Sequence, residues 1–337
     1  MAATAPARPA PWSDRSYLVV GLVLVGLALY QQHAGRLGVP GAFGKADRLS
    51  GLVTFNQFLL LAAVVTAFWM VFGVSGRFAF STASFVGLGA YGSHYLTRES
   101  LLPVVAGALL ATAFGTLLAL GFALLLRRAQ HFYFAVATLG LAEVLLLVFG
   151  RWDRLTGRSS GEISGAEDLS FAGWAVDSRF RSMLVLLAFL GLVLLLGALI
   201  RRSPVERIAV AARDNPAVAA SLGHDPDRPG IVLFTLGSGL ATMAGALFVH
   251  TRGLANTDSF GIELGIGIFV ALILGGLHSL WGGLVGAWFY VYAPMYLERW
   301  EEWSGVLWGA VLVVVMMVFP EGLVGLAGRA RALVRRR

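Results

Sequence analysis

Cysteine is absent from this chain of 337 residues. Its absence excludes disulfides, a thiolate metal site and a thiol nucleophile. Charge is scarce as well, because only 13% of the residues are Asp, Glu, Lys or Arg, against about 25% in soluble domains. Hydrophobic residues make up 57% of the chain. This balance indicates a polytopic membrane protein.

The phosphate-binding pattern GxxxxGK[ST] is also missing, and no polar region is long enough to form a nucleotide-binding domain. If ATP drives this protein, another chain therefore hydrolyses it. The sequence has no cluster of His, Asp and Glu suited to a membrane enzyme, and no pair of histidines with metal-ligand spacing. We therefore expect a protein that is not itself an enzyme and that binds no metal or cofactor.

The net charge of +7 does not indicate a nucleic-acid partner, because the arginines lie beside apolar segments. Membrane proteins keep such basic residues on the cytoplasmic side. Arginines follow the apolar segment 102–126, occur throughout the central loop 201–229, and recur in the tail 326–337. In the loop 151–181, acidic residues offset the arginines. We therefore expect that loop on the outside, and the other three groups and both termini in the cytoplasm.

Apolar segments long enough to cross a bilayer recur along the whole sequence. They predict an all-α fold with about ten transmembrane helices, at 17–30, 50–73, 79–96, 102–126, 132–150, 183–200, 230–250, 264–277, 280–298 and 304–320. Five spans precede the outer loop and five follow it, an arrangement typical of an inverted repeat. No repeat is evident in the sequence itself. We expect a disordered cytoplasmic N-terminus at 1–15, a transmembrane domain at 16–325 and a basic tail at 326–337.

The central loop, residues 201–229, which we call the coupling loop, is polar but predicts two short helices in succession. Each helix begins with a capping residue followed by proline, the first start fits a capping box, and a glycine ends the second helix. The residues are Ser203, Pro204, Glu206, Asn215, Pro216 and Gly223. We expect a rigid element at the membrane surface that contacts another molecule; an ordinary solvated loop is the alternative.

Two regions could line a path through the membrane. The segment 75–96 is apolar but interrupted by small and hydroxylated residues, which permit either close helix packing or a broken helix beside a path. Glu143 is the one acid well inside an apolar segment, so we expect it to face the interior of the bundle. It is interpreted either as a path or gating residue or as a structural hydrogen-bonding group.

Five segments, in this order and spacing, resemble a known transporter family. They are FSTASFVGLGAY at 80–91, YFAVATLGLAE at 133–143, ARDNPAVAASLG at 212–223, GGLHSLWG at 275–282 and FPEGLVG at 319–325. Together they are similar to the permease subunit of branched-chain amino acid ATP-binding cassette (ABC) importers, the LivM-type member of the LivH/LivM pair. Residues 157–161 and 81–84 depart from the family pattern, which leaves urea and short amides open as solutes besides branched-chain or other hydrophobic amino acids.

The resemblance implies a multi-pass protein of the bacterial cytoplasmic (inner) membrane. Its partners would be a second, LivH-type permease subunit, two ATP-binding subunits that hold ATP and Mg²⁺, and an outside solute-binding protein. The ATPase-coupling residues implied are Glu206, Arg207, Arg213, Asp214, Asn215, Pro216, Ala220 and Gly223. Candidates for the translocation path are Ser81, Thr82, Ser84, Gly89, Tyr91, Tyr133 and Glu143. A self-sufficient secondary transporter is the alternative, and it would require ion-binding groups inside the membrane.

Overall fold

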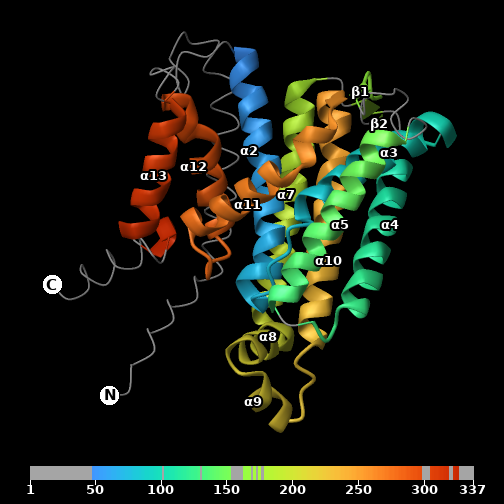
Figure 1. Cartoon of the computed structure of the whole chain (residues 1–337). Helices are drawn as coiled ribbons and strands as arrows, with labels where there is room; N and C mark the ends of the chain where they lie inside the picture. The colour runs from blue at the N-terminus through green and yellow to red at the C-terminus, as the bar shows by residue number, and fades with distance from the viewer. Residues whose placement is uncertain are drawn as a thin grey trace.

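Helices arranged as a bundle account for most of the described structure (Figure 1). The computed structural model describes residues 48–100, 102–129, 131–152, 162–167, 170–171, 174–175, 178–297, 304–318 and 322–325. The predicted span at 17–30, the N-terminal segment 1–15 and the tail 326–337 lie outside the described residues.

The first half of the bundle begins with α2 (Arg48–Phe68), which runs without interruption into a π-helical turn, η1 (Trp69–Val74). It continues with α3 (Thr82–Ser100), α4 (Val104–Leu125) and α5 (His131–Arg151). After the large loop come α7 (Arg179–Arg202), α8 (Pro204–Asp214), α9 (Pro216–Ser221) and α10 (Arg228–Arg252). The chain then forms η2 (Thr257–Phe260), α11 (Ile262–Gly275), α12 (Gly282–Leu297) and α13 (Ser304–Val318).

The strands in the described part of the chain form two short antiparallel pairs at one end of the bundle (Figure 1). β1 (Ile163–Ser164) pairs with β4 (Leu254–Ala255), and β2 (Ser170–Phe171) pairs with β3 (Trp174–Ala175). The carbonyl oxygen of Glu167 lies 2.8 Å from the ring nitrogen Nδ1 of His250 and ties this loop to the end of α10. Because each strand has only two residues, the predicted all-α class is confirmed.

The number of membrane spans stays a prediction. Within the described residues, six helical stretches are long and apolar enough to cross a bilayer: Gly51–Val74, Val104–Leu125, Phe132–Arg151, Arg179–Arg202, Arg228–Arg252 and Thr257–Gly275. The predicted segments 79–96, 280–298 and 304–320 also coincide with helices. However, α12 and α13 are only 16 and 15 residues long, and α3 carries many polar residues. The inverted repeat is likewise a prediction that these observations leave open.

The centre of the bundle is the packing of α3 against α10. A Cβ atom added to Gly89 would overlap the carbonyl oxygen of Thr242, and one added to Gly245 would overlap that of Val86. The two backbones therefore touch in both directions, as small residues allow between membrane helices. Around this pair, α4 packs on both helices, and α2 packs on α7, α10, α11 and α12.

Glycines also shape the turn between α11 and α12. Gly276 has a φ of 124°, a conformation that a residue with a side chain rarely adopts. Added Cβ atoms at Gly275 and Gly286 would overlap the backbone of Gly282 and Ala271. The glycines thus let the chain reverse tightly and let α11 and α12 pack backbone to backbone.

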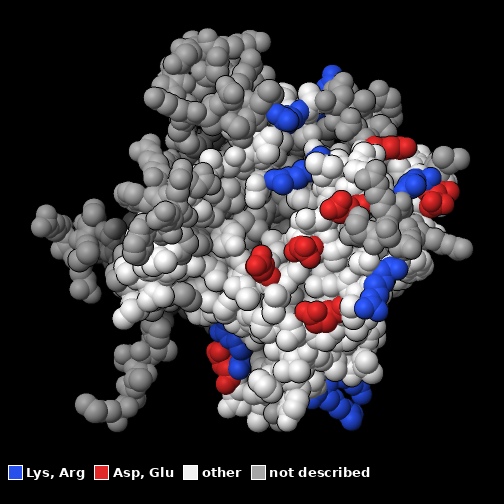
Figure 2. Space-filling model, turned by 45° about the horizontal axis from the view of Figure 1, so that its top comes forward, with Lys and Arg blue, Asp and Glu red and all other residues white. Residues whose placement is uncertain are grey.

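The end of the molecule that carries β1 and β2 has mixed charge. Figure 2, in which this end is turned forward, shows both acidic and basic side chains set in a mostly uncharged surface. Exposed residues near the ends of α3 and β1 include Arg98, Glu99 and Glu162. This composition fits the charge balance from which the loop 151–181 was assigned to the outside.

Candidate functional site

The coupling loop forms two helices, α8 and α9, which project from the end of the bundle opposite β1 and β2 (Figure 1). Arg201 and Arg202 close α7 immediately before this element, and Arg228 opens α10 immediately after it. The helix pair is thus held between two long apolar helices at the arginine-rich end. The predicted pair of short helices is confirmed.

The start of α8 differs from the predicted capping box. Pro204 does occupy the first helical turn, but the Ser203 side chain makes no capping hydrogen bond. Its hydroxyl instead donates to the carbonyl oxygen of Ile200 at 2.7 Å. Ser203 is at once the last cap of α7 and the first cap of α8, and its hydroxyl is used by α7. The capping-box prediction is therefore wrong, although the helix boundary is right.

The start and end of α9 follow the prediction closely. The Asn215 side-chain oxygen accepts hydrogen bonds from the backbone N–H groups of Ala217 and Val218, at 3.1 and 3.3 Å. At the other end, Gly223 has a φ of 79°. Its N–H donates to the Ala220 carbonyl, and the next N–H donates to the Ala219 carbonyl. This is a Schellman ending, which satisfies the last carbonyls and stops the helix.

One face of the helix pair is buried and the other is free for contact. Ala209, Ala212 and Ala219 are buried, which accounts for the apolar spacing in the sequence. Most of the predicted coupling residues lie on the exposed side: Arg207, Asp214, Asn215, Pro216, Ala220 and Gly223. Beside them, Val218 is 50% exposed and Leu222 is 68% exposed. The exposed face thus combines charge with apolar side chains, as protein interfaces do.

The two other predicted coupling residues attach the pair to the bundle. The Arg213 Nη1 atom donates to the carbonyl oxygen of Gly73 in η1 at 3.0 Å, and its Nε atom lies 3.2 Å from Asp214 Oδ1. Glu206 Oε1 lies 3.8 Å from Arg201 Nε. The Arg201 guanidinium in turn lies 6.0 Å from the ring centre of Trp69, also in η1.

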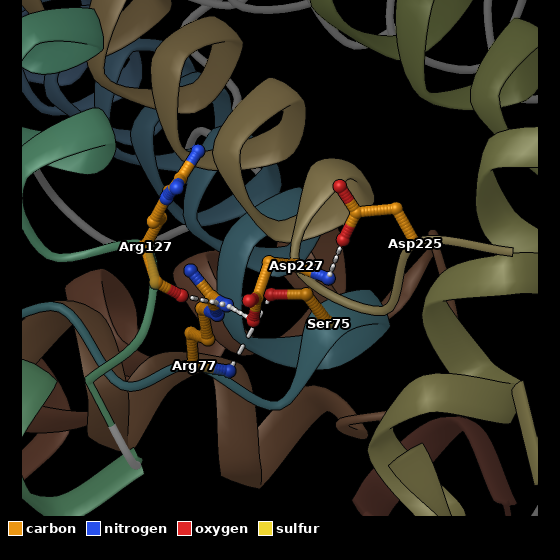
Figure 3. Close-up of polar contacts among 5 residues, drawn as sticks. All are labelled: Ser75, Arg77, Arg127, Asp225 and Asp227. Carbon is orange, nitrogen blue, oxygen red and sulfur yellow. Dashed lines mark hydrogen bonds and ion pairs between the residues drawn. The ribbon is translucent and has the colours of Figure 1, made fainter. Parts of the chain in front are cut away.

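A second attachment to the bundle centres on Arg77, which sequence reasoning missed (Figure 3). Its Nη2 atom donates to Asp227 Oδ1 at 2.9 Å and lies 3.4 Å from the carbonyl oxygen of Arg127. The Asp227 N–H donates to Asp225 Oδ1 at 3.0 Å. Burial lowers the pKa of the Arg77 guanidinium, while the charge of Asp227 opposes that shift. The sequence feature that could have indicated this role is that Arg77 is an isolated arginine between two apolar segments.

The predicted path residues on α3 lie inside the packing of this chain. Thr82 and Ser84 are buried and bond to the carbonyl oxygens of Ala79 and Ala142. Tyr91 is buried with its ring stacked on Phe149 at 4.8 Å between centroids. Ser81 and Gly89 belong to the same buried surface. Their placement is what close helix packing requires, and their role in a path stays a prediction.

Tyr133 and Glu143 lie elsewhere, on the exposed face of α5. Tyr133 is 64% exposed, and Glu143 is also exposed, ten residues further along. The expectation that Glu143 faces the interior of this bundle is therefore wrong, because the buried side of α5 is taken by apolar residues such as Phe134 and Phe149. Among the described residues, no group of three or more acids and histidines could hold a metal ion.

Residues 49–316 match the family model described as "Branched-chain amino acid transport system / permease component". The chain belongs to this permease family. The matched range includes the coupling loop and most of the described helices. No solved structure matches the chain significantly.

Relatives of this permease include both kinds of subunit of one transport system. The chain is 29% identical to the high-affinity branched-chain amino acid transport system permease protein LivM of Escherichia coli K12, over 75% of this chain and 65% of that protein. It is 26% identical to LivH of the same strain, over 81% of this chain and 82% of that protein. A third relative, the autoinducer 2 import system permease protein LsrC of Klebsiella pneumoniae, is 30% identical over 66% of this chain and 63% of that protein.

Proposed function

We propose that this chain is the membrane-spanning permease subunit of an ABC importer that carries branched-chain or other hydrophobic amino acids. It would act with a second, LivH-type permease subunit, two ATP-binding subunits and an outside solute-binding protein. The observation that carries the proposal is the coupling loop in a chain of this family. It is a pair of short helices, the second capped by Asn215, with an exposed mixed face at the arginine-rich end of the bundle.

In this proposal the chain itself performs no chemistry. ATP and Mg²⁺ bind the partner subunits, whose closure pushes on the exposed face of α8 and α9. Only Ser203 separates α7 from α8, and the six residues 222–227, which the Arg77–Asp227 ion pair holds to the bundle, separate α9 from α10. A push on the helix pair would therefore reach both long helices. The permease then alternates between two arrangements whose populations follow the nucleotide state of the ATPase.

We place the translocation path along the exposed face of α5, between this chain and the second permease. A charged side chain at the centre of a lipid-facing helix costs about 2.5–3.5 kcal/mol, so the exposed Glu143 favours a protein or water environment on that face. Gly140, one turn earlier, has no atom within 4 Å of where its Cβ would be. Another chain or a solute could therefore approach the helix closely there.

The proposal is tested by purifying the tagged chain with co-expressed partners in a gentle detergent and reconstituting it into vesicles. We expect a P-loop ATPase and a second permease to co-purify, and leucine uptake to require ATP and the solute-binding protein. Uptake of urea or a short amide in place of leucine would retain the importer and change its solute. Uptake without ATP that follows a proton or sodium gradient would contradict the proposal and favour a secondary transporter.

A further inference from the structure

The end of α2 is an unusual piece of helix. It widens into η1, after which Gly76 turns the chain with a φ of 72°. Ser75 stabilises this ending, because its hydroxyl donates to the Val71 carbonyl at 2.6 Å. π-helical turns leave the regular ladder of backbone hydrogen bonds locally altered and occur often at sites of function. Here, carbonyl groups of η1 are accessible to donors from other segments.

Arg213, at the end of α8, uses one of these carbonyls. Its Nη1 atom donates to the Gly73 oxygen at 3.0 Å. Gly76 makes room for the same side chain, because a Cβ at that position would lie 2.7 Å from Arg213 Cγ and Cδ. The coupling loop thus contacts the end of η1 through the side chain of Arg213.

Arg77 joins the last part of the coupling loop, at Asp227, to the same place. Figure 3 shows its guanidinium pointing between Asp227, from the loop before α10, and the backbone of Arg127, from the connection between α4 and α5. One side chain therefore connects three segments that are distant in sequence. The coupling loop is thus tied at two points, at Arg213 near the junction of α8 and α9 and at Asp227 just before α10, to the five residues Gly73–Arg77.

The Arg77 side of this connection is buried and tightly enclosed. Its side chain is 9% exposed, against 38% for Asp227. The guanidinium lies 5.5 Å from the ring centre of Phe134 in α5, and a Cβ on Gly230 would lie 2.7 Å from its Nε. Removing one partner of a buried ion pair leaves an uncompensated charge and is strongly destabilising. The Arg77–Asp227 ion pair should therefore stay intact when the coupling loop moves, so that the two residues move together.

One nitrogen of Arg77 points to a second arrangement. Its Nη1 atom is buried and has no hydrogen-bond partner among the described residues. A buried donor without an acceptor costs free energy, and a conformation that supplies one recovers it. We therefore expect a second conformation in which Arg77 Nη1 finds an acceptor, so that the contact has two states.

We propose that Arg77, through Asp227, and Arg213, through Gly73, form a relay that passes movement of the coupling loop to η1 and to the α4–α5 connection. The relay rests on the proposed function, in which an ATPase moves α8 and α9. Because the α4–α5 connection leads directly into α5, the relay would displace the helix face that carries Tyr133 and Glu143. Arg77, Arg213 and Asp227 are positioning residues and do not contact the solute.

The test compares Asp227→Asn with the wild type in the full reconstituted importer. Asparagine keeps the shape of the side chain and removes the charge that holds Arg77. We expect uptake per ATP hydrolysed to fall at least about fivefold, the lower range of coupling between distant sites. The ATPase should still co-purify, because the exposed face of α8 and α9 is unchanged. Asp227→Glu, which restores the charge, should recover most of the loss.

Arg228→Gln is the matched control. Arg228 is exposed and lies next to Asp227, outside the relay, so this variant should behave as the wild type. Wild-type uptake per ATP in Asp227→Asn would overturn the relay and leave the proposed function standing. A wild-type complex without ATP-driven uptake would overturn both. If Asp227→Asn does not assemble, Arg213→Gln takes its place with the same expected loss, since it removes the bond to Gly73 without leaving a buried charge.

Discussion

Gly245 is the residue whose replacement we expect to damage the bundle most directly. A Cβ atom there would overlap the Val86 carbonyl oxygen, so Gly245→Ala must force α3 and α10 apart. Overpacking of a well-filled core costs about 1–3 kcal/mol. We expect a lower melting temperature for the purified chain in detergent, measured by the loss of soluble protein on heating.

Gly191 provides the matched control for that measurement. It lies in α7, and nothing is within 4 Å of where its Cβ would be. Gly191→Ala should leave the melting temperature unchanged or raise it, because alanine favours a helix over glycine by about 1 kcal/mol. Equal losses in the two variants would contradict the close contact between α3 and α10.

Substitution of Glu143 tests where the translocation path lies. Glu143→Gln keeps the size and hydrogen-bonding capacity of the side chain but removes its charge. We expect leucine uptake to fall about tenfold or more, because a hydrogen bond to a charged group contributes about 1.5–3 kcal/mol. The measurement is the initial uptake rate in vesicles containing equal amounts of assembled complex.

The comparison for Glu143 is Leu147→Ala, one turn further along the same exposed face. This change removes apolar area and no charge, so uptake should change much less. If Glu143→Gln instead prevents the two permease chains from co-purifying, the residue serves the contact between the chains and not the path. Those two outcomes separate the interpretations that the sequence leaves open.

The helices α8 and α9 begin differently, so removing the polar side chain at each start should have a different effect. Asn215→Ala removes the acceptor for two backbone N–H groups of α9, a loss of about 1 kcal/mol for a typical cap. If the same 1 kcal/mol is lost from ATPase binding at the exposed face, the amount of ATPase recovered with the tagged chain should fall about fivefold.

Ser203→Ala should have little effect on the same recovery. The Ser203 hydroxyl does not cap α8, and the Ile200 carbonyl to which it donates also accepts the backbone N–H of Ser203. That carbonyl stays satisfied when the hydroxyl is lost. A loss for Ser203→Ala as large as that for Asn215→Ala would contradict the hydrogen bonding described for α8.

The absence of cysteine makes the sidedness of the whole chain directly measurable. Leu222→Cys introduces a single thiol on the exposed part of the coupling loop, and Glu162→Cys introduces one beside β1. In intact cells we expect a membrane-impermeant thiol reagent to label only the variant at 162. In inside-out vesicles it should label only the variant at 222, with the wild type as an unlabelled background.

Labelling of both positions from the same side would contradict the cytoplasmic placement of the coupling loop. The two elements lie at opposite ends of the bundle (Figure 1), so a membrane around the apolar helices separates them. The arginine distribution predicts which end of the bundle faces the cytoplasm. The experiment therefore tests the topology prediction independently of any partner.

Many of the helices of this protein could be predicted from sequence alone, because their signals are local. Apolar length predicted the helical segments, and cap residues predicted α8 and α9 and the end of α9, because these signals act within a few residues of the chain. The two errors have the same origin. In each case another group already occupies the expected place. The Ser203 hydroxyl bonds to Ile200 of the preceding helix, and apolar residues of α5 itself take the buried side that was expected for Glu143.

Only the tertiary structure decided which residues connect the coupling loop to the bundle. Arg77, Asp227 and Gly73 are separated by up to 154 positions, from Gly73 to Asp227, and no periodicity or capping rule relates them. Their contact depends on how α2, α5 and α10 pack, which is set by long-range burial and by glycines that let backbones meet. The sequence by itself thus determined the helices, and packing decided what those helices hold together.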